Sequence, residues 1–290
     1  MTHRYVGREL TDADIDTIRR ICADPTYPTR AAIARETCRC LGWVGANGKP
    51  KDMSAKVALA RMDADGLIDL PAPTHKATRP YRHLQETITP GPEIACRLSE
   101  LSDIEIALVG RATRASAVWN EMIGRFHYLG YTPASGAQLR YLATTTTGAP
   151  IAAISFAASA WALEDRDAWI GWNAEQRKAR LHLVVGNPRF LVAPWVAVPN
   201  LASHLLAAIT RRLRGDWQAR YGYAPVLVET FVHSDRHRGT CYQAANWTRV
   251  GRTKGRGKLD RYNAYALPVK DIYLYPLARS FRSQLTAPLH

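Results

Sequence analysis

Cysteine is scarce in this sequence of 290 residues. The five cysteines, Cys22, Cys38, Cys40, Cys96 and Cys241, are odd in number and scattered, and none forms a CxxC pair. A disulfide framework needs an even set, and a zinc knuckle needs closely paired ligands. Neither class of small stapled protein is therefore predicted.

Long apolar runs are also missing. No stretch approaches the roughly 20 apolar residues that a membrane-spanning helix requires, and no basic start leads into an apolar segment at the N-terminus. We therefore expect a cytoplasmic protein that does not bind membranes. The hydrophobic content of 47% is enough for a full core, and the length leaves one or two domains open, of which we expect two.

Acidic residues are too few to balance the basic ones. Asp and Glu number 25 against 39 Lys and Arg, which gives a formal net charge of +14. Solubility needs a smaller surplus, whereas a polyanionic partner would account for the excess. The charge therefore favours nucleic acid, and DNA first, as the partner.

The first 71 residues follow a helical pattern. Thr11 and Asp14 form a capping-box start for a helix that runs to about Asp24. Further apolar periodicity predicts helices from Pro28 to Gly42 and from about Met53 to Gly66, and LIDLP (67–71) is typical of a short strand. Three helices and a strand suggest a winged helix-turn-helix at 1–71. A small helical subdomain that only packs on its neighbour is the alternative.

Basic side chains lie on or just before the third predicted helix. In winged helix-turn-helix folds this helix enters the major groove. Lys51, Lys56 and Arg61 are therefore candidate nucleic-acid-binding residues, although the same residues would also suit a solvated helix face.

A proline-rich segment follows. Residues 72–98 have few apolar positions and no sustained period, which predicts a linker. Beyond it, residues 99–290 alternate helices and strands, including a long helix from Leu201 that ends at Gly222 and the strand PVLVETFV (225–232). The fold class expected for this part is α/β with a mixed sheet.

The order of the last elements resembles the second half of the GNAT acyltransferase fold. Tyr242, Trp247 and the pair Val250–Gly251 stand where that fold has a tyrosine, an aromatic residue and a glycine-containing strand. The resemblance implies that Tyr242 protonates a leaving group. Core packing is the alternative role for Tyr242.

A more specific resemblance is to the DUF4338 family, which includes the DruA component of Druantia anti-phage systems and domains encoded beside transposases. It rests on the motifs FHYLGY (126–131), NPRFLV (187–192), VPNLASHLL (198–206), ETFV (229–232), RGTCYQAANW (238–247) and VGRTKGRGK (250–258). A weaker likeness, to the Mom DNA-modification protein of phage Mu, implies DNA as the acceptor. Other defence-system or transposon proteins are implied partners.

One departure from acyltransferases concerns the cofactor. Acyl-CoA enzymes bind the pyrophosphate on the backbone amides of a glycine-rich turn that opens the long helix. This chain has no glycine between Val198 and Leu206, so the close approach of a phosphate is less easy there. Binding of acyl-CoA is therefore doubtful.

Acidic and histidine residues gather near the end of the strand 225–232. Glu229 lies in a predicted buried strand, where a carboxylate needs a partner or a chemical role. Asp235 and His233 follow in a polar loop and are candidate acids or bases. A salt bridge for Glu229 and a solvated loop for the histidine are the alternatives. A divalent metal is a further interpretation, without a diagnostic ligand spacing.

Three more residues are candidates for chemistry. Cys241 is predicted at a helix start beside Arg236 and Arg238, where a thiolate would be stabilised. A small buried thiol is the alternative. His127 and Tyr128 form a second candidate pair, for which a structural aromatic cluster is the other reading.

The remaining candidates are basic. Arg189 follows Asn187 and Pro188 at a strand start and is suited to hold a phosphate, or to form a salt bridge at the rim of the core. A glycine-rich basic stretch follows the Tyr242 helix and predicts contact with a polyanion. The full nucleic-acid-binding set adds Arg236, Arg238, Arg252, Lys254, Arg256 and Lys258.

The sequence thus predicts a nucleic-acid-acting protein with a GNAT-like core that modifies or processes DNA in anti-phage defence or a mobile element. The alternatives are a DNA-binding module with an inert pocket and a small-molecule acyltransferase.

Overall fold

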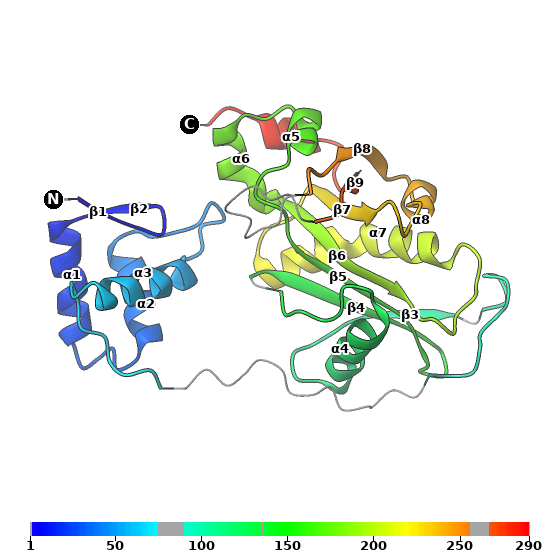
Figure 1. Cartoon of the computed structure of the whole chain (residues 1–290), viewed down its shortest axis with the longest axis horizontal. Helices are drawn as coiled ribbons and strands as arrows, with labels where there is room; N and C mark the ends of the chain where they lie inside the picture. Colours follow the sequence, from blue (N-terminus) through cyan, green and yellow to red (C-terminus); the bar gives the residue numbers. More distant parts are fainter. Residues whose placement is uncertain (1, 75–89, 102, 135, 256–266, 290) are drawn as a thin grey trace. The chain divides into compact units, whose positions relative to one another are not determined.

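The chain forms two compact units in a computed structural model, residues 1–82 and 83–290 (Figure 1). The structure describes residues 2–74, 90–101, 103–134, 136–255 and 267–289. Most of the expected linker, 75–89, lies outside these ranges. The end of that segment belongs to the second unit, because Ile94 bridges to Val196 and packs on the core. No helix in the described parts of the chain is long and apolar enough to cross a membrane.

The N-terminal unit contains a hairpin and three helices. They are β1 (Thr2–Tyr5), β2 (Arg8–Thr11), α1 (Asp12–Ala23), α2 (Arg30–Cys40) and α3 (Asp52–Ala64). The predicted capping box is present, since the Thr11 side chain accepts from the Asp14 amide and Asp14 accepts from the Thr11 amide. Apolar side chains from all three helices meet in one core around Ile18, Ile33 and Leu59.

The β-structure of this unit is not where the sequence suggested. The strand expected at 67–71 does not form, because the backbone amides there close the end of α3. Leu67 donates to the Met62 carbonyl and Leu70 to the Asp63 carboxylate. The hairpin precedes α1 instead, and the eleven-residue segment 41–51 separates α2 from α3. The three helices are confirmed, whereas the winged helix stays a prediction.

The second unit is built on a seven-stranded mixed sheet, which confirms the α/β class. The strand order is β3-β4-β5-β6-β7-β9-β8, and every neighbouring pair is antiparallel except β6 and β7. The strands are β3 (Ile104–Leu108), β4 (Gln138–Thr145), β5 (Pro150–Ala158), β6 (Val184–Val192), β7 (Leu227–His233), β8 (Thr248–Arg252) and β9 (Lys270–Pro276).

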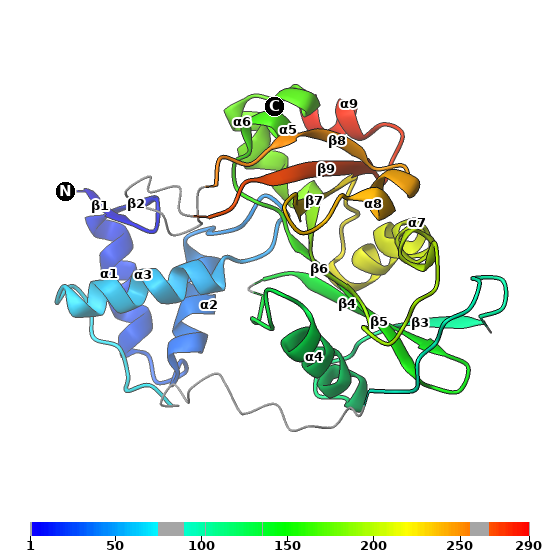
Figure 2. The ribbon, with the colours of Figure 1, turned by 45° about the vertical axis from the view of Figure 1, so that its right-hand side comes forward.

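Helices cover both faces of this sheet (Figure 2). Neighbouring residues of β4 point to opposite faces: Leu142 packs with Trp119 of α4 (Arg114–Phe126), and Tyr141 lies in the core that includes Leu205 of α7 (Leu201–Tyr221). The remaining helices are α5 (Glu164–Ile170), α6 (Ala174–Arg180), α8 (Thr240–Ala244) and α9 (Phe281–Thr286).

The parallel strands β6 and β7 separate halfway along their length. Their pairing ends at Asn187 and Thr230. Beyond this point β7 stays paired with β9, and β6 stays paired with β5. Pro188 follows Asn187 and has no backbone N–H to donate to a ladder. Between the Gly186 and Arg189 pairings with β5, β6 also carries one extra residue, which is a bulge that bends the strand.

A buried ion pair lies on one face of β7. Glu229 is fully buried and accepts from Arg166 at 2.8 Å and from the Ala160 amide at 2.7 Å. Arg166 is buried as well and donates to Asp167 at 2.9 Å. Burial raises the pKa of Glu229, while Arg166 opposes that rise. The expectation of acid–base chemistry at Glu229 is therefore corrected: the carboxylate ties α5 to the sheet.

This pair predicts the effect of removing one charge. Glu229→Gln should lower the free energy of unfolding by about 3 kcal/mol, because it leaves the Arg166 charge buried with a weaker partner. Urea unfolding followed by circular dichroism measures the change. Glu164→Gln is the matched control: the Glu164 side chain is 69% exposed in its pair with Lys254, and the variant should stay within about 0.5 kcal/mol of wild type. If Glu229→Gln and Glu164→Gln lose equal amounts of unfolding free energy, the Glu229–Arg166 pair does not stabilise the fold.

Candidate functional site

A pocket of about 490 Å³ opens where β6 and β7 separate. Ligand sites in α/β sheets form at such points, outside the carboxyl ends of parallel strands. The lining comes from the end of α4, from both strands, from the loop between β7 and α8, from the start of α8 and from Lys270 at the start of β9. Four separate segments of the chain therefore converge on one cavity.

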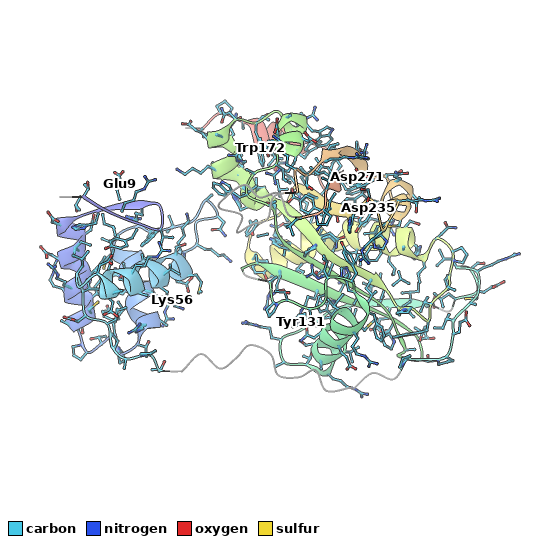
Figure 3. The ribbon with its side chains drawn as sticks, in the orientation of Figure 1. Glu9, Lys56, Tyr131, Trp172, Asp235 and Asp271 are labelled. Carbon is cyan, nitrogen blue, oxygen red and sulfur yellow. The ribbon has the colours of Figure 1, made fainter. Side chains whose placement is uncertain are left out.

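Most of the predicted catalytic residues meet in this pocket. Those that line it are His127, Tyr128, His233, Cys241 and Tyr242, together with the predicted phosphate ligands Arg189, Arg236 and Arg238. Glu229 does not line it, because it points to the opposite face of β7 from Thr230. Asp235 does not line it either and lies on the loop after β7, where its side chain is 84% exposed (Figure 3).

Asn187 orients the hydrogen bonds of the buried polar residues that line the pocket. Its side-chain amide donates to the carbonyls of Ser155 at 2.8 Å and Arg189 at 3.1 Å. Because a carbonyl only accepts, the NH₂ group of Asn187 must point towards these two carbonyls, and its amide oxygen therefore faces Tyr242. The Tyr242 hydroxyl donates to this oxygen at 2.9 Å, and Thr230 donates to the Asn187 carbonyl at 3.1 Å. The proton of Tyr242 is therefore held by Asn187.

Burial makes the candidate general acid Tyr242 and the candidate nucleophile Cys241, both at the α8 start, less acidic. It raises the pKa of the Tyr242 phenol, so the hydroxyl keeps its proton at neutral pH. Burial also raises the pKa of the Cys241 thiol. The loss of hydration therefore opposes the stabilisation of a Cys241 thiolate that the sequence predicted. Cys241 lines the pocket as a protonated thiol packed against the main core.

His127 is neutral in the pocket. Burial lowers its pKa to about 4, and the nearby Arg189 and His237 act in the same direction. Its Nδ1 accepts from the Leu129 amide at 3.2 Å, which places the single proton on Nε2. His127 therefore offers a hydrogen-bond donor at physiological pH.

Rings and a guanidinium surround Tyr128 at the mouth. His127 stacks on Tyr128 with centroids 5.0 Å apart, and the ring of His237 lies at 5.8 Å. The guanidinium carbon of Arg236 lies 5.3 Å from the Tyr128 ring centre. The aromatic cluster given as the alternative role of this pair is thus present, and it forms part of the pocket wall.

Four cations also line the pocket, beside apolar side chains such as Phe190 and Phe231. Arg189 donates to the carbonyls of Gly130 at 3.0 Å and Pro188 at 2.9 Å, which fixes its guanidinium. Burial lowers the pKa of Lys270, and the charge of Arg189 lowers it further. Arg236 and Arg238 line the exposed side. In the part of the chain that the structure describes, no aspartate or glutamate lines the pocket, so the site is suited to an anion.

A divalent metal site was one interpretation of the loop that carries His233 and Asp235. His233 Nε2 lies 3.5 Å from an Asp235 carboxylate oxygen. Among the residues that the structure describes, no group of three or more His, Cys, Asp or Glu side chains is placed to hold a metal ion.

The predicted basic strand is engaged within the protein. Arg252 pairs with Asp271 at 3.0 Å, and its amide donates to Asp165 at 2.7 Å. Lys254 pairs with Glu164. These cations are exposed but already have acidic partners. Arg256 and Lys258 lie outside the described residues.

The candidate cations of the N-terminal unit lie along α3. Lys51 precedes the helix, Arg61 is exposed in its last turn, and Lys56 lies 4.0 Å from Asp52 one turn earlier. Their role in binding nucleic acid stays a prediction.

The start of α7 bears on acyl-CoA binding. Asn200 adopts a left-handed conformation before the helix, and its side chain makes no capping bond. The first helical residue, Leu201, is buried. All of 198–206 is described, and none of these residues lines the pocket. The pocket is therefore formed without the helix start that acyl-CoA enzymes use.

Sequence reasoning missed three lining residues. Asn187 was seen only as a neighbour of Arg189, although an amide next to a proline in a strand was a usable signal. Thr230 alternates with Glu229 along β7, so the two could not share a face. Lys270 reaches the pocket because it pairs with His233 across β7 and β9, which no local pattern reveals.

The fold is similar to that of solved acetyltransferases. Spermidine N-acetyltransferase from Vibrio cholerae, in complex with CoA and spermine, matches with a TM-score of 0.40 and 9% identity, over 60% of this chain and 95% of that chain. A GNAT superfamily phosphinothricin acetyltransferase from Sinorhizobium meliloti, in complex with AcCoA, matches with a TM-score of 0.30 and 15% identity, over 49% and 62%.

The sequence itself gives a more specific match. No curated protein matches it. The family model described as Druantia protein DruA matches residues 63–266, which is most of the chain and includes every residue of the pocket except Lys270. The chain therefore belongs to the Druantia DruA family.

Proposed function

We propose that this protein acts on nucleic acid, and that the pocket between β6 and β7 binds a DNA strand for modification or processing. The observation that carries the proposal is the composition of the pocket. Four cations, Arg189, Arg236, Arg238 and Lys270, line it, and no carboxylate is found among its described lining residues. Phosphate is the anion that such a set recognises along a nucleic acid.

The overall charge supports the same partner. A net charge of +14 favours association with a polyanion before any specific contact forms. Family membership also supports it, since the resemblance on which the sequence prediction rested is to a component of Druantia anti-phage systems. Foreign DNA is the target that we propose for it.

Groups suited to chemistry lie beside the cations. Tyr242 and His127 are neutral groups whose protons are held in defined positions, and both line the pocket with the phosphate ligands. A strand bound by its phosphates would therefore meet positioned polar groups, which favours an enzyme over an inert binding module.

Binding should depend on the pocket cations. Arg238→Ala and Lys270→Ala should each weaken binding of a short oligonucleotide, and each should reduce the slope of log affinity against log salt by about 1, because one phosphate contact is lost. Fluorescence anisotropy over a salt series measures both quantities. Arg214→Ala is the matched control, since Arg214 is an exposed arginine on α7 that does not line the pocket. If all three variants bind like wild type, strands bind elsewhere.

His127 should report the bound anion. Its pKa of about 4 is lowered in part by Arg189, and a phosphate beside that guanidinium would offset the repulsion. Saturating oligonucleotide should therefore raise the His127 pKa towards its ordinary value of 6.5. An NMR titration of the histidine ring protons measures this change, with the exposed His204 of α7 as the control. An unchanged His127 titration would place the anion away from the pocket.

An enzyme should leave a product. DNA from cells that express the protein should contain a nucleoside of altered mass, or show processed ends. Cells with Tyr242→Phe at equal expression should lack this change, because the variant removes only the hydroxyl. Mass spectrometry of digested nucleosides and mapping of strand ends provide the two readings. Unaltered DNA in both assays would favour the inert binding module.

A further inference from the structure

The pocket floor and rim differ in what they offer to a ligand. The rim consists of the exposed lining residues Tyr128, Arg236, His237 and Arg238, which supply rings and positive charge. The floor consists of the buried residues Asn187, Thr230 and Tyr242, which supply no charge. A ligand that fills both must have an anionic end and a neutral polar end.

The hydrogen bonds within the floor decide whether it offers donors or acceptors to a ligand. The Tyr242 hydroxyl donates its only proton to the Asn187 side chain. The Thr230 hydroxyl donates its proton to the Asn187 backbone carbonyl at 3.1 Å, with the Tyr242 oxygen as a longer acceptor at 3.4 Å. The Asn187 amide cannot turn to offer its NH₂ group, because it would face the carbonyls of Ser155 and Arg189 with an oxygen. Both hydroxyl protons are therefore used within this network, and what the two oxygens still have for a ligand is lone pairs.

From this geometry we infer that the pocket takes one unpaired nucleotide whose base carries an amino group, with the phosphate at the rim cations and the amino group donating to Tyr242. The inference rests on the proposed function and names the substrate class of the same site. The cavity of about 490 Å³ has room for a single nucleotide and not for a duplex. The target base must therefore leave its stack or come from a single strand.

A base with a carbonyl at the same position would be disfavoured. Its oxygen would face the lone pair of Tyr242, unless the phenol turned and lost its bond to Asn187. Cytosine and uracil provide the closest comparison, because they differ at ring position 4 by an amino group in place of a carbonyl. Tyr242 is thus assigned a selecting role.

The test compares dCMP with dUMP on the full chain by NMR chemical-shift titration. Wild type should bind dCMP about tenfold more tightly than dUMP, because one hydrogen bond is exchanged for a repulsive contact. Tyr242→Phe should bring the ratio close to one while both nucleotides still bind through the rim. Asn187→Ala, which frees the phenol proton, should reduce the ratio by improving dUMP binding. Thermal unfolding of each variant shows whether it is folded.

The outcomes separate this inference from the function on which it rests. The selecting role would be overturned if wild type bound dCMP and dUMP equally well, or if Tyr242→Phe kept the preference for dCMP. It would also be overturned if the protein bound oligonucleotides but neither nucleotide. In each case the salt-dependent binding of oligonucleotides at Arg238 and Lys270 could still stand. Loss of that oligonucleotide binding would overturn the proposed function itself.

Discussion

The pocket exists because β6 and β7 stop pairing at Asn187 and Thr230. Pro188 cannot donate to the ladder, and the extra residue of β6 forms a bulge that bends that strand. The side chains at the point of separation then face a cavity and no longer face a neighbouring strand. Every residue to which we assign a role in the pocket lies within or around this break, so the candidate site follows from one local property of the backbone.

Asn187 connects this break to the chemistry of the pocket. Its amide donates to carbonyls of β5 and β6 and accepts from the Tyr242 hydroxyl. A buried polar group must form hydrogen bonds to be stable. Here those hydrogen bonds also fix the orientation of the Asn187 amide. The same network that stabilises the broken sheet therefore decides which atoms Tyr242 offers to a ligand. Glu229, one residue before Thr230, has the separate task of holding α5 through Arg166.

Much of the site was predictable from sequence, but not the face of the sheet to which each side chain points. Apolar periodicity gave the three N-terminal helices and the order of the later strands, because helices and strands bury alternate faces at fixed intervals. It could not show that Glu229 points away from the pocket, or that burial opposes a thiolate at Cys241. The missing strand at 67–71 was decided by hydrogen bonds to Met62 and Asp63, and Lys270 entered through a pairing of strands distant in sequence.

Photo-crosslinking locates a bound strand most directly and tests the central claim that it enters the pocket between β6 and β7. A single-stranded oligonucleotide carrying 5-iododeoxyuridine would be crosslinked to the full chain, and the adducts mapped by peptide mass spectrometry. The account predicts adducts on peptides from 127–131 and 233–242, whose aromatic and histidine side chains line the cavity. Adducts confined to α7 or to residues 2–74 would contradict it.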